Sequence, residues 1–420
     1  MIEIKTRKIR NCAVAVPGSK SYTHRCLVAA ALAEDVCRLE NCLDSEDTRL
    51  TRRALTQMGV RFEDQNGTTV VHGTGGRLAA CDDPIDLVNS GTSMRLLTAV
   101  AALGQGPYVL TGSQRMQQRP IGDLLDGLNR LGVSARSLKQ AGFPPLAVDG
   151  RDIKGGAVSL KCGLSSQFLS ALLLIAPYLD EGLDISVVEG PVSKPYVDLT
   201  VNIMETFGVR LERNKYSRFR VAGGQRYQGG RYAVEVDASQ ASYFWAAAAI
   251  TGTTIKVLGV SSASRQGDVR FLDVLEAMGC RVSHEADGIA VTGGKLVSVE
   301  VDMADMPDVV PTLAVVAAFA RGTTVIRNVA HLKEKESDRL AVMAGGLTRM
   351  GIIAMNDNVG LTVIGGRPAG ARIDPHNDHR IAMSFAVAGL VTPGVIIEDE
   401  ACVEKSFPTF WKVLDALYED

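Results

Sequence analysis

The sequence predicts an α/β protein assembled from repeated units of helix and strand. Two kinds of helix recur along the chain: one that ends in an apolar residue followed by glycine, and one that is apolar throughout but begins with polar residues. The last helix, near 410–417, is of the first kind but has no strands after it, and the strands expected within 2–16 can supply them. The chain is therefore expected to begin and end in one domain, with a separate domain inserted between.

Glycine marks the end of each helix of the first kind. The pattern is visible five times, and its glycines are roughly 70–76 residues apart, a longer period than the ~20–50 residues of a solenoid repeat. Each glycine is expected at the C′ position, where a left-handed backbone ends a helix. The five are Gly59, Gly132, Gly208, Gly279 and Gly351. A strand, a polar turn and a second strand follow each of them, which predicts one small sheet for each repeat.

The second kind of helix is expected in the interior, because its body consists mainly of Ala, Leu and Val. Six segments have this form: 19–33, 89–100, 165–173, 237–248, 306–314 and 377–386. Their polar first residues must meet solvent or a ligand, since buried polar groups without partners are costly. The positive ends of six helix dipoles are therefore expected to converge on one cleft.

The first of these helices carries the clearest binding motif. Pro17 and Gly18 break the chain, Ser19 is an N-cap residue type, and Lys20 and Arg25 flank the helix start. Free N–H groups and cations at a helix N-terminus favour an anion, here a phosphate or a carboxylate. A P-loop is excluded because serine, and not glycine, precedes the lysine. The alternative interpretation is a capped helix with two solvated cations.

The composition excludes several classes of function. The 420 residues carry a net charge of −2, with 46% hydrophobic and 22% charged residues, so no basic field is directed at nucleic acid or an anionic membrane. No apolar stretch is long enough to span a bilayer, and the first eight residues lack the apolar core of a signal peptide. The eight cysteines form no CxxC pair and are expected as buried thiols in a reducing cytoplasm.

Further segments contain residues suited to anion binding or acid–base chemistry. Arg119 precedes a proline and is expected in an extended conformation, either solvated or with its guanidinium directed at a carboxylate or phosphate. The charged run 331–340 is either a solvated helix start or one wall of a cleft. His376 and His379 have no third ligand at helical spacing, so a capped helix start is favoured over a metal site. Asp308 is either a carboxylate of a first helical turn or a base.

Taken together, these segments resemble the 5-enolpyruvylshikimate-3-phosphate synthase family, the 3-phosphoshikimate 1-carboxyvinyltransferases. The matching segments run in the family's order over essentially the whole chain: 17–21, 89–95, 118–122, 165–168, 193–196, 237–243, 307–308, 335–339, 377–380 and 405–408. Each segment alone is weakly specific, whereas the ordered set is very specific. The resemblance implies an inside-out α/β barrel of two similar lobes, each with three units, comprising residues 1–19 plus 236–420 and residues 20–235. The buried helix N-termini would converge on the cleft between the lobes.

The resemblance also implies a reaction. The enolpyruvyl group of phosphoenolpyruvate moves to the 5-hydroxyl of shikimate 3-phosphate by addition and elimination, and phosphate is released on the route to chorismate and the aromatic amino acids. The implied partners are these two small molecules, with no nucleic acid, no membrane, no cofactor and no metal. The implied protein is a cytoplasmic monomer.

By the same resemblance, individual residues receive roles. Asp308 is the base for the 5-hydroxyl proton, and Glu336 and Lys20 are the candidates for protonating the methylene carbon. Shikimate 3-phosphate is bound by Lys20, Ser21, Arg25, Ser165, Ser166, Gln167, Ser193, Tyr196, Asp308 and Lys335. Phosphoenolpyruvate is bound by Lys20, Gly91, Arg119, Gln167, Arg339, Arg380 and Lys405. His331 stands where some members have asparagine, and it is left out of the site.

Three alternatives remain open at this stage. The sister enolpyruvyl transferase that acts on UDP-N-acetylglucosamine is expected to carry a reactive cysteine in the loop before Arg119, and residues 114–118 contain none. A metal-dependent phosphate hydrolase would use His376 and His379. A non-catalytic binding protein for phosphorylated acids is disfavoured by Asp308 and Glu336, because carboxylates weaken anion binding unless they do chemistry.

Overall fold

The structure is a computed structural model that describes residues 1–150 and 153–419. Its contacts divide the chain into two compact units: unit 1 is Met1–Pro17 with Glu235–Asp420, and unit 2 is Gly18–Val234. The sequence-based boundaries lie at 19/20 and 235/236. Each unit has its own hydrophobic core, and the two sets of core residues do not overlap.

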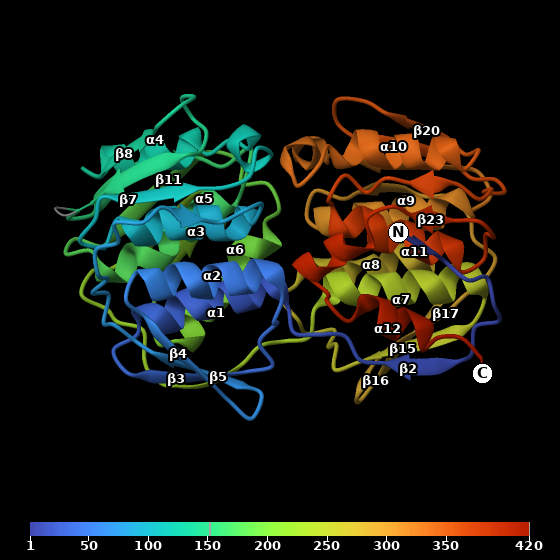
Figure 1. Cartoon of the computed structure of the whole chain (residues 1–420), viewed down its shortest axis with the longest axis horizontal. Helices are drawn as coiled ribbons and strands as arrows, with labels where there is room; N and C mark the ends of the chain where they lie inside the picture. Colours follow the sequence, from blue (N-terminus) through green and yellow to red (C-terminus); the bar gives the residue numbers. More distant parts are fainter. Residues whose placement is uncertain (151–152, 420) are drawn as a thin grey trace. The chain divides into compact units, whose positions relative to one another are not determined.

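Each unit repeats one supersecondary pattern three times (Figure 1). A strand leads into a buried helix, then come a second strand and an amphipathic helix, and an antiparallel hairpin completes the sheet. In the last repeat of unit 1, a single strand from the start of the chain takes the place of the hairpin. In the described part of the chain, five sheets have four strands and one has three. This is the repeated helix-and-strand architecture that the sequence predicts.

Unit 2 contains three four-stranded sheets. Their strands are β3 (Val36–Glu40), β4 (Arg61–Gln65), β5 (Thr68–His72) and β14 (Gly230–Ala233); β6 (Ile85–Asp86), β7 (Tyr108–Thr111), β8 (Ser134–Ser137) and β9 (Leu146–Asp149); and β10 (Gly156–Lys161), β11 (Leu183–Glu189), β12 (Glu212–Asn214) and β13 (Arg218–Val221). Its buried helices are α1 (Lys20–Leu32), α3 (Gly91–Ala101) and α5 (Gln167–Ile175). Its amphipathic helices are α2 (Glu46–Gln57), α4 (Gly122–Arg130) and α6 (Pro195–Thr206).

Unit 1 has the same organisation. Its strands are β2 (Cys12–Val14), β15 (Thr254–Leu258), β16 (Arg281–Glu285) and β17 (Gly288–Thr292); β18 (Glu300–Asp302), β19 (Thr323–Arg327), β20 (Ile353–Asn356) and β21 (Leu361–Ile364); and β1 (Ile2–Glu3), β22 (Arg372–Ile373) and β23 (Ile396–Ile397). The buried helices are α7 (Ala238–Thr251), α9 (Val310–Ala318) and α11 (His379–Gly389). The amphipathic helices are α8 (Phe271–Ala277), α10 (Arg339–Arg349) and α12 (Phe410–Asp415), and short 3₁₀ turns include η4 (Pro307–Val309), η5 (Ala330–Glu334) and η6 (Glu400–Lys405).

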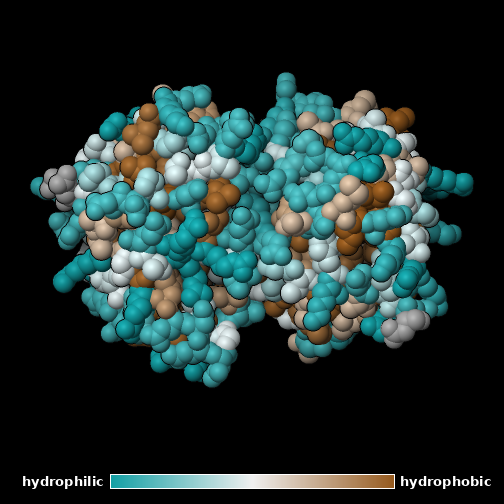
Figure 2. All heavy atoms as spheres, in the orientation of Figure 1, coloured by the Kyte–Doolittle hydropathy of each residue, from teal (hydrophilic) through white to brown (hydrophobic). Residues whose placement is uncertain are grey.

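Within each unit the buried helices contact one another and the sheets lie outside them. Helices α1, α3 and α5 make pairwise contacts in unit 2, as do α7, α9 and α11 in unit 1. Strands then cover these helices: α1 contacts β5, α7 contacts β15 and β17, and α9 contacts β21. A helical interior with an outer layer of strands is an α/β barrel turned inside out, as the family resemblance implies. Figure 2 shows mainly hydrophilic residues, with smaller hydrophobic patches, on the visible face of each unit.

The two segments that join the units follow from strand pairing. Strand β2 precedes α1 but pairs in parallel with β15, and β14 precedes α7 but pairs in parallel with β3. Each of these strands therefore completes a sheet of the unit that the chain is about to leave. The expectation that all strands within 2–16 complete the C-terminal repeat is wrong in part: β1 pairs with β23, whereas β2 belongs to the sheet that follows α7.

The glycines that end the amphipathic helices have the predicted conformation. Their φ angles are 93° at Gly59, 89° at Gly132, 88° at Gly208, 102° at Gly279 and 78° at Gly351. A side chain is strained in this left-handed region, so glycine ends the helix at low cost. Within residues 1–150 and 153–419, no helix combines the length and the apolar character that crossing a bilayer requires.

Candidate functional site

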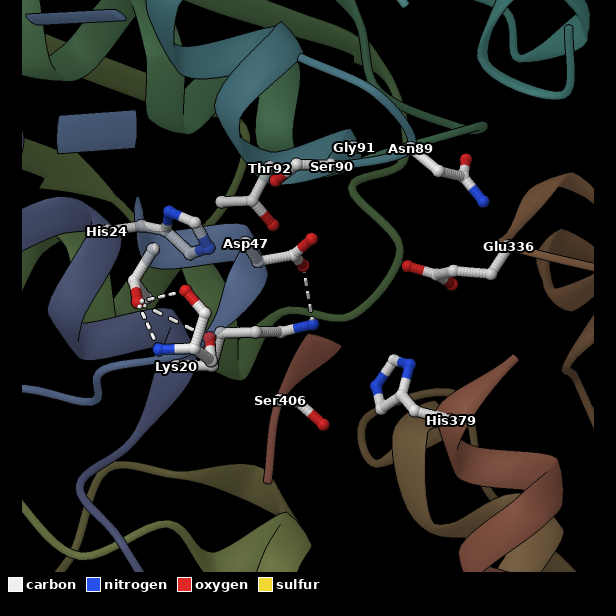
Figure 3. Close-up of polar contacts among 12 residues, drawn as sticks. Lys20, His24, Asp47, Asn89, Ser90, Gly91, Thr92, Glu336, His379 and Ser406 are labelled. Atoms are coloured by element: carbon white, nitrogen blue, oxygen red, sulfur yellow. Dashed lines mark hydrogen bonds and ion pairs between the residues drawn. The ribbon is translucent and has the colours of Figure 1, made fainter. Parts of the chain in front are cut away.

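The predicted anion site at the start of α1 is buried, not solvated. Ser19 is the N-cap, and its hydroxyl accepts a hydrogen bond from the backbone N–H of Tyr22. The side chain of Lys20 donates from Nζ to Oδ2 of Asp47 at 3.0 Å (Figure 3), and both residues are buried. Asp47 lies in the first turn of α2 and was not among the predicted residues. The interpretation of Lys20 and Arg25 as two solvated cations is therefore wrong.

Arg25 is an internal anchor of unit 2. Its Nε donates to the hydroxyl of Thr200 at 2.7 Å, and its Nη2 donates to the hydroxyl of Ser170 at 3.2 Å. Backbone carbonyls of Ser21 and Tyr196 accept from the same guanidinium at 3.0 and 3.4 Å. Burial lowers the pKa of Arg25 to about 10, so the group remains charged at neutral pH. Arg25 thus joins α1, α5 and α6, and brings together three of the elements predicted to bind shikimate 3-phosphate.

Three of the four serines predicted for this subsite lie at or just before the starts of α5 and α6, and the fourth, Ser21, lies in the first turn of α1. The hydroxyl of Ser165 accepts a hydrogen bond from the backbone N–H of Gln167 at 3.2 Å, and Ser166 is the N-cap of α5. Ser193 has a φ of 53°, the left-handed conformation that non-glycine residues rarely adopt. Strained backbone of this kind is common at ligand-binding positions.

Arg119 and Gly91 are in close contact in unit 2. Arg119 is extended (φ −92°, ψ 121°), as its position before proline predicts, and it is buried. Its Nη1 donates to the carbonyl oxygen of Asn89 at 3.2 Å. A Cβ atom built on Gly91 would lie only 2.4 Å from Nη2 of Arg119. The side-chain amide of Gln167 donates to Thr92 at 3.0 Å, which places Gln167 beside the start of α3.

In unit 1, one arginine binds three carboxylates. Arg339 donates from Nε to Asp378 Oδ2 at 2.8 Å, from Nη1 to Asp308 Oδ1 at 3.0 Å, and from Nη2 to Glu336 Oε2 at 2.8 Å. Arg380 donates from Nη2 to the other oxygen of Asp308 at 2.7 Å. The structure thus brings together Asp308, Glu336, Arg339 and Arg380, which lie on three separate segments of the sequence.

The charges in this cluster control its protonation. Burial opposes ionisation of Asp308, but Arg380 and Arg339 outweigh it and hold the pKa of that carboxyl far below its usual range. Asp308 is therefore a carboxylate at neutral pH, as a base must be. Nearby, burial and then the charge of Asp308 raise the pKa of Asp268 to about 7. Burial, followed by the positive charge of Lys335, lowers the pKa of His331 to about 3.

Unit 1 also contains Lys405 and the two predicted histidines. Lys405 ends η6 and is buried, beside Ser406, whose hydroxyl accepts from Gln240 Nε2 at 3.1 Å. His376 is exposed, whereas His379 is completely buried at the start of α11. Among the described residues, no group of three or more His, Cys, Asp or Glu side chains is arranged to hold a metal ion. The capped helix start that the sequence predicts is present: Asp378 caps α11 by accepting from the backbone N–H of Arg380.

Sequence reasoning missed several polar residues of these clusters. Asp47, Asn89, Thr92 and Asp378 contact predicted residues directly. Asn89, Thr92 and Asp378 lie in helix-start segments that the sequence had already singled out, and Asp47 lies in the first turn of the next helix. These positions are the signal that points to them. A cavity of about 800 Å³ in unit 2, lined by residues including Asp184, Arg210 and Arg220, contains none of the predicted site residues.

Comparison with known proteins places this geometry in one family. The family described as EPSP synthase (3-phosphoshikimate 1-carboxyvinyltransferase) matches residues 5–414. Proteins named 3-phosphoshikimate 1-carboxyvinyltransferase from Methanoculleus marisnigri and Syntrophobacter fumaroxidans are each 46% identical, over 96% of this chain and 96% of their own.

Solved structures give the same answer. An EPSP synthase structure from Acinetobacter baumannii is similar with a TM-score of 0.82 and 30% identity, covering 99% of this chain and 97% of that one. The match extends over both units and includes every segment on which the sequence resemblance was based. The chain belongs to the EPSP synthase family.

Proposed function

We propose that this chain transfers the enolpyruvyl group of phosphoenolpyruvate to the 5-hydroxyl of shikimate 3-phosphate and releases phosphate. Its membership of the EPSP synthase family supports this reaction. The observation that carries the proposal is that Arg339 and Arg380 each bind one oxygen of Asp308, while Arg339 also binds Glu336. Two cations suited to an anionic substrate are thus joined directly to two carboxylates suited to proton transfer.

Substrate binding is assigned to both units. In unit 2, Ser21, Arg25, Ser165, Ser166, Ser193 and Tyr196 bind shikimate 3-phosphate, with Gln167 between the two substrates. Lys20, Gly91 and Arg119 of unit 2, and Arg339, Arg380 and Lys405 of unit 1, bind phosphoenolpyruvate. The burial of Lys20, Arg119, Arg339, Arg380 and Lys405 supports this assignment, because ion pairing to a phosphate is stronger where water is excluded.

Proton transfer is assigned to unit 1 and Lys20. Asp308, with Lys335 beside it, removes the proton of the 5-hydroxyl, and the oxygen bonds to C2 of phosphoenolpyruvate. Glu336 or Lys20 delivers a proton to the methylene carbon, which becomes a methyl group. Elimination then breaks the bond between C2 and the phosphate oxygen, a methyl proton returns to the protein, and the enol double bond re-forms.

Binding of an anionic substrate to the two arginines makes Asp308 a stronger base. In the structure both of its oxygens accept N–H groups, which stabilises the carboxylate and weakens its basicity. An anionic substrate that takes hydrogen bonds from Arg339 and Arg380 leaves Asp308 with less stabilisation, so its pKa rises. Basicity is thereby coupled to occupation of the phosphoenolpyruvate subsite.

The proposed setting is a cytoplasmic monomer that needs no cofactor, nucleic acid or membrane. Eight free cysteine thiols agree with a reducing compartment, and a net charge of −2 does not favour polyanion binding. In this setting the arginines and helix N-termini, and not a metal ion, neutralise the substrate phosphates.

Phosphate release by the purified protein tests the function. Shikimate 3-phosphate and phosphoenolpyruvate are supplied together and singly, with a chelator and no added metal, and UDP-N-acetylglucosamine replaces shikimate 3-phosphate in a parallel reaction. We expect release only with the first pair. Binding of both substrates without release would contradict catalysis, and release with UDP-N-acetylglucosamine would reassign the acceptor.

A further inference from the structure

Two buried polar contacts, one helical turn apart, connect α1 and α2. The first is the ion pair between Lys20 and Asp47 at 3.0 Å. The second joins Nδ1 of His24 to the hydroxyl of Thr51 at 2.8 Å. Lys20 and His24 are four residues apart on α1, and Asp47 and Thr51 are four apart on α2. Since residues at this spacing share a helix face, both helices present one contact pair per turn toward each other.

Helix α3 is hydrogen-bonded to the second of these contacts, the one between His24 and Thr51. The hydroxyl of Thr51 is 2.7 Å from that of Ser93, which is 2.6 Å from that of Ser90. Ser93 also donates to the backbone carbonyl of Asp47 at 3.4 Å. His24, Thr51, Ser90 and Ser93 are each at most 1% exposed, so this chain of hydrogen bonds has no contact with bulk water. The chain joins α1 and α2, four residues beyond Lys20 and Asp47, to the start of α3. Figure 3 shows Lys20, Asp47 and Gly91 on these helices.

The start of α3 packs against Arg119. A Cβ atom on Gly91 would lie 2.4 Å from Nη2 of Arg119, so the guanidinium lies directly against the backbone of Gly91. A shift of the start of α3 would therefore move the surface against which Arg119 is held. Likewise, a change in the spacing of α1 and α2 would alter the Lys20–Asp47 pair.

We propose that His24 is a positioning residue for phosphoenolpyruvate binding, an inference that rests on the transferase function proposed above. Through Thr51 and Ser93, His24 sets the spacing of α1, α2 and α3. It thereby holds Lys20 and the Gly91–Arg119 contact in the geometry that phosphoenolpyruvate binding requires. His24 is completely buried, one helical turn further along α1 than Lys20, and it acts through its hydrogen bond with Thr51.

Hydrogen bonding, and not the volume of the imidazole, is what this role requires. Asn at position 24 places a polar atom at the same distance from Cβ as Nδ1 of histidine, whereas Leu has a comparable branched shape without one. Ser93→Ala removes the link between α2 and α3. Thr98→Val is the matched control, because Thr98 is equally buried on α3 but its hydroxyl donates only to the carbonyl of Met94, within the helix.

Steady-state kinetics provide the first test. We expect His24→Leu and Ser93→Ala to raise the KM for phosphoenolpyruvate about fivefold or more while the KM for shikimate 3-phosphate changes less than about twofold. His24→Asn should restore the phosphoenolpyruvate KM to within about twofold of the wild type, and Thr98→Val should leave it unchanged. Equal effects on both substrates, or no difference between Leu and Asn at position 24, would overturn the positioning role.

Chemical labelling provides a test that does not depend on turnover. Lys20 is acylated with N-hydroxysuccinimidyl acetate, and the rate is followed by mass spectrometry of the peptide that contains it. We expect faster acylation of Lys20 in His24→Leu and Ser93→Ala than in the wild type, and no change in Thr98→Val. If the wild type lacks transferase activity, the proposed function fails, but the labelling rates still decide the positioning role. If His24→Leu does not fold, Ser93→Ala and Thr51→Val decide it, and unchanged labelling in these two would refute it.

Discussion

Arg380 donates from Nη2 to Oδ2 of Asp308 at 2.7 Å, while the other oxygen of Asp308 accepts from Arg339 at 3.0 Å. Each carboxylate oxygen therefore has its own guanidinium, which keeps Asp308 ionised and fixes its orientation. In the proposed mechanism, this carboxylate accepts a proton once a substrate competes for the two arginines.

The first prediction concerns this carboxylate. Asp308→Asn retains the shape of the side chain but removes the base, so we expect kcat to fall by about 10²–10⁴-fold in the phosphate-release assay. Asp305→Asn is the control, since Asp305 lies three residues earlier and pairs with Arg270 at the surface. Its kcat should remain at the wild-type value. An Asp308→Asn protein with near-normal kcat would mean that another group is the base.

A second prediction follows from the contact between Gly91 and Arg119. In Gly91→Ala the new Cβ would lie 2.4 Å from Nη2 of Arg119, so the guanidinium must move. We expect the KM for phosphoenolpyruvate to rise about tenfold, since small misplacements of binding groups have large kinetic effects. Gly345→Ala is the control, because a Cβ there meets no atom within 4 Å. That variant should keep its KM and gain about 0.4–1 kcal/mol of stability. An unchanged KM in Gly91→Ala would show that Arg119 does not contribute to the subsite.

Arg25 provides a prediction about stability. Its guanidinium donates to Thr200, Ser170 and two backbone carbonyls in a fixed planar geometry, which a lysine ammonium cannot reproduce. We expect Arg25→Lys to lower the free energy of unfolding by about 3 kcal/mol in urea titrations, because buried donors and acceptors lose partners. The exposed Arg210 serves as control, and Arg210→Lys should change stability by less than about 0.5 kcal/mol. Equal stability of the two variants would contradict the anchoring role of Arg25.

The pH dependence of stability tests the environment of His331. Burial and Lys335 lower the pKa of His331 to about 3 in the folded protein, whereas in the unfolded chain it is about 6.5. Below the unfolded value the unfolded state binds more protons, so stability falls as pH decreases through this range. The folded protein should therefore lose about 2 kcal/mol from this group between pH 7 and pH 5.

Comparison with His331→Asn isolates that contribution. The raised pKa of Asp268, about 7, has the opposite sign, because the folded state then holds its proton more tightly and stability falls as pH rises. Asp268 is present in both proteins, so its effect cancels in the difference between their urea unfolding curves. Parallel pH profiles for wild type and variant would show that His331 titrates equally in both states.

Much of the fold was predictable because its signals are local. The five C′ glycines and the extended Arg119 are each determined by a few neighbouring residues, and all have the predicted conformation. Pairing between distant segments was not predictable in the same way. Strand β2 reads as a strand from its own residues, but nothing in them specifies β15 as the neighbour.

In the candidate site, too, single residues could be predicted, whereas their partners on distant segments could not. Lys20 and Arg339 were identified as residue types suited to anions, because cations at helix starts carry that meaning individually. Their partners Asp47 and Asp378 were missed, since Asp47 is 27 residues from Lys20 and Asp378 is 39 residues from Arg339. A periodicity or a cap signal reports on one helix at a time and carries no information about which carboxylate faces which cation.

The fate of the bridging oxygen of phosphoenolpyruvate tests the central claim most directly. Phosphoenolpyruvate labelled with ¹⁸O between C2 and phosphorus is incubated with shikimate 3-phosphate and the wild-type protein, and the products are analysed by mass spectrometry. Addition and elimination break the C2–O bond, so the account predicts that all of the label appears in inorganic phosphate and that the acceptor gains an unlabelled enolpyruvyl group. Label retained with the three-carbon fragment would mean that the P–O bond breaks, and would contradict an enolpyruvyl transfer by this protein.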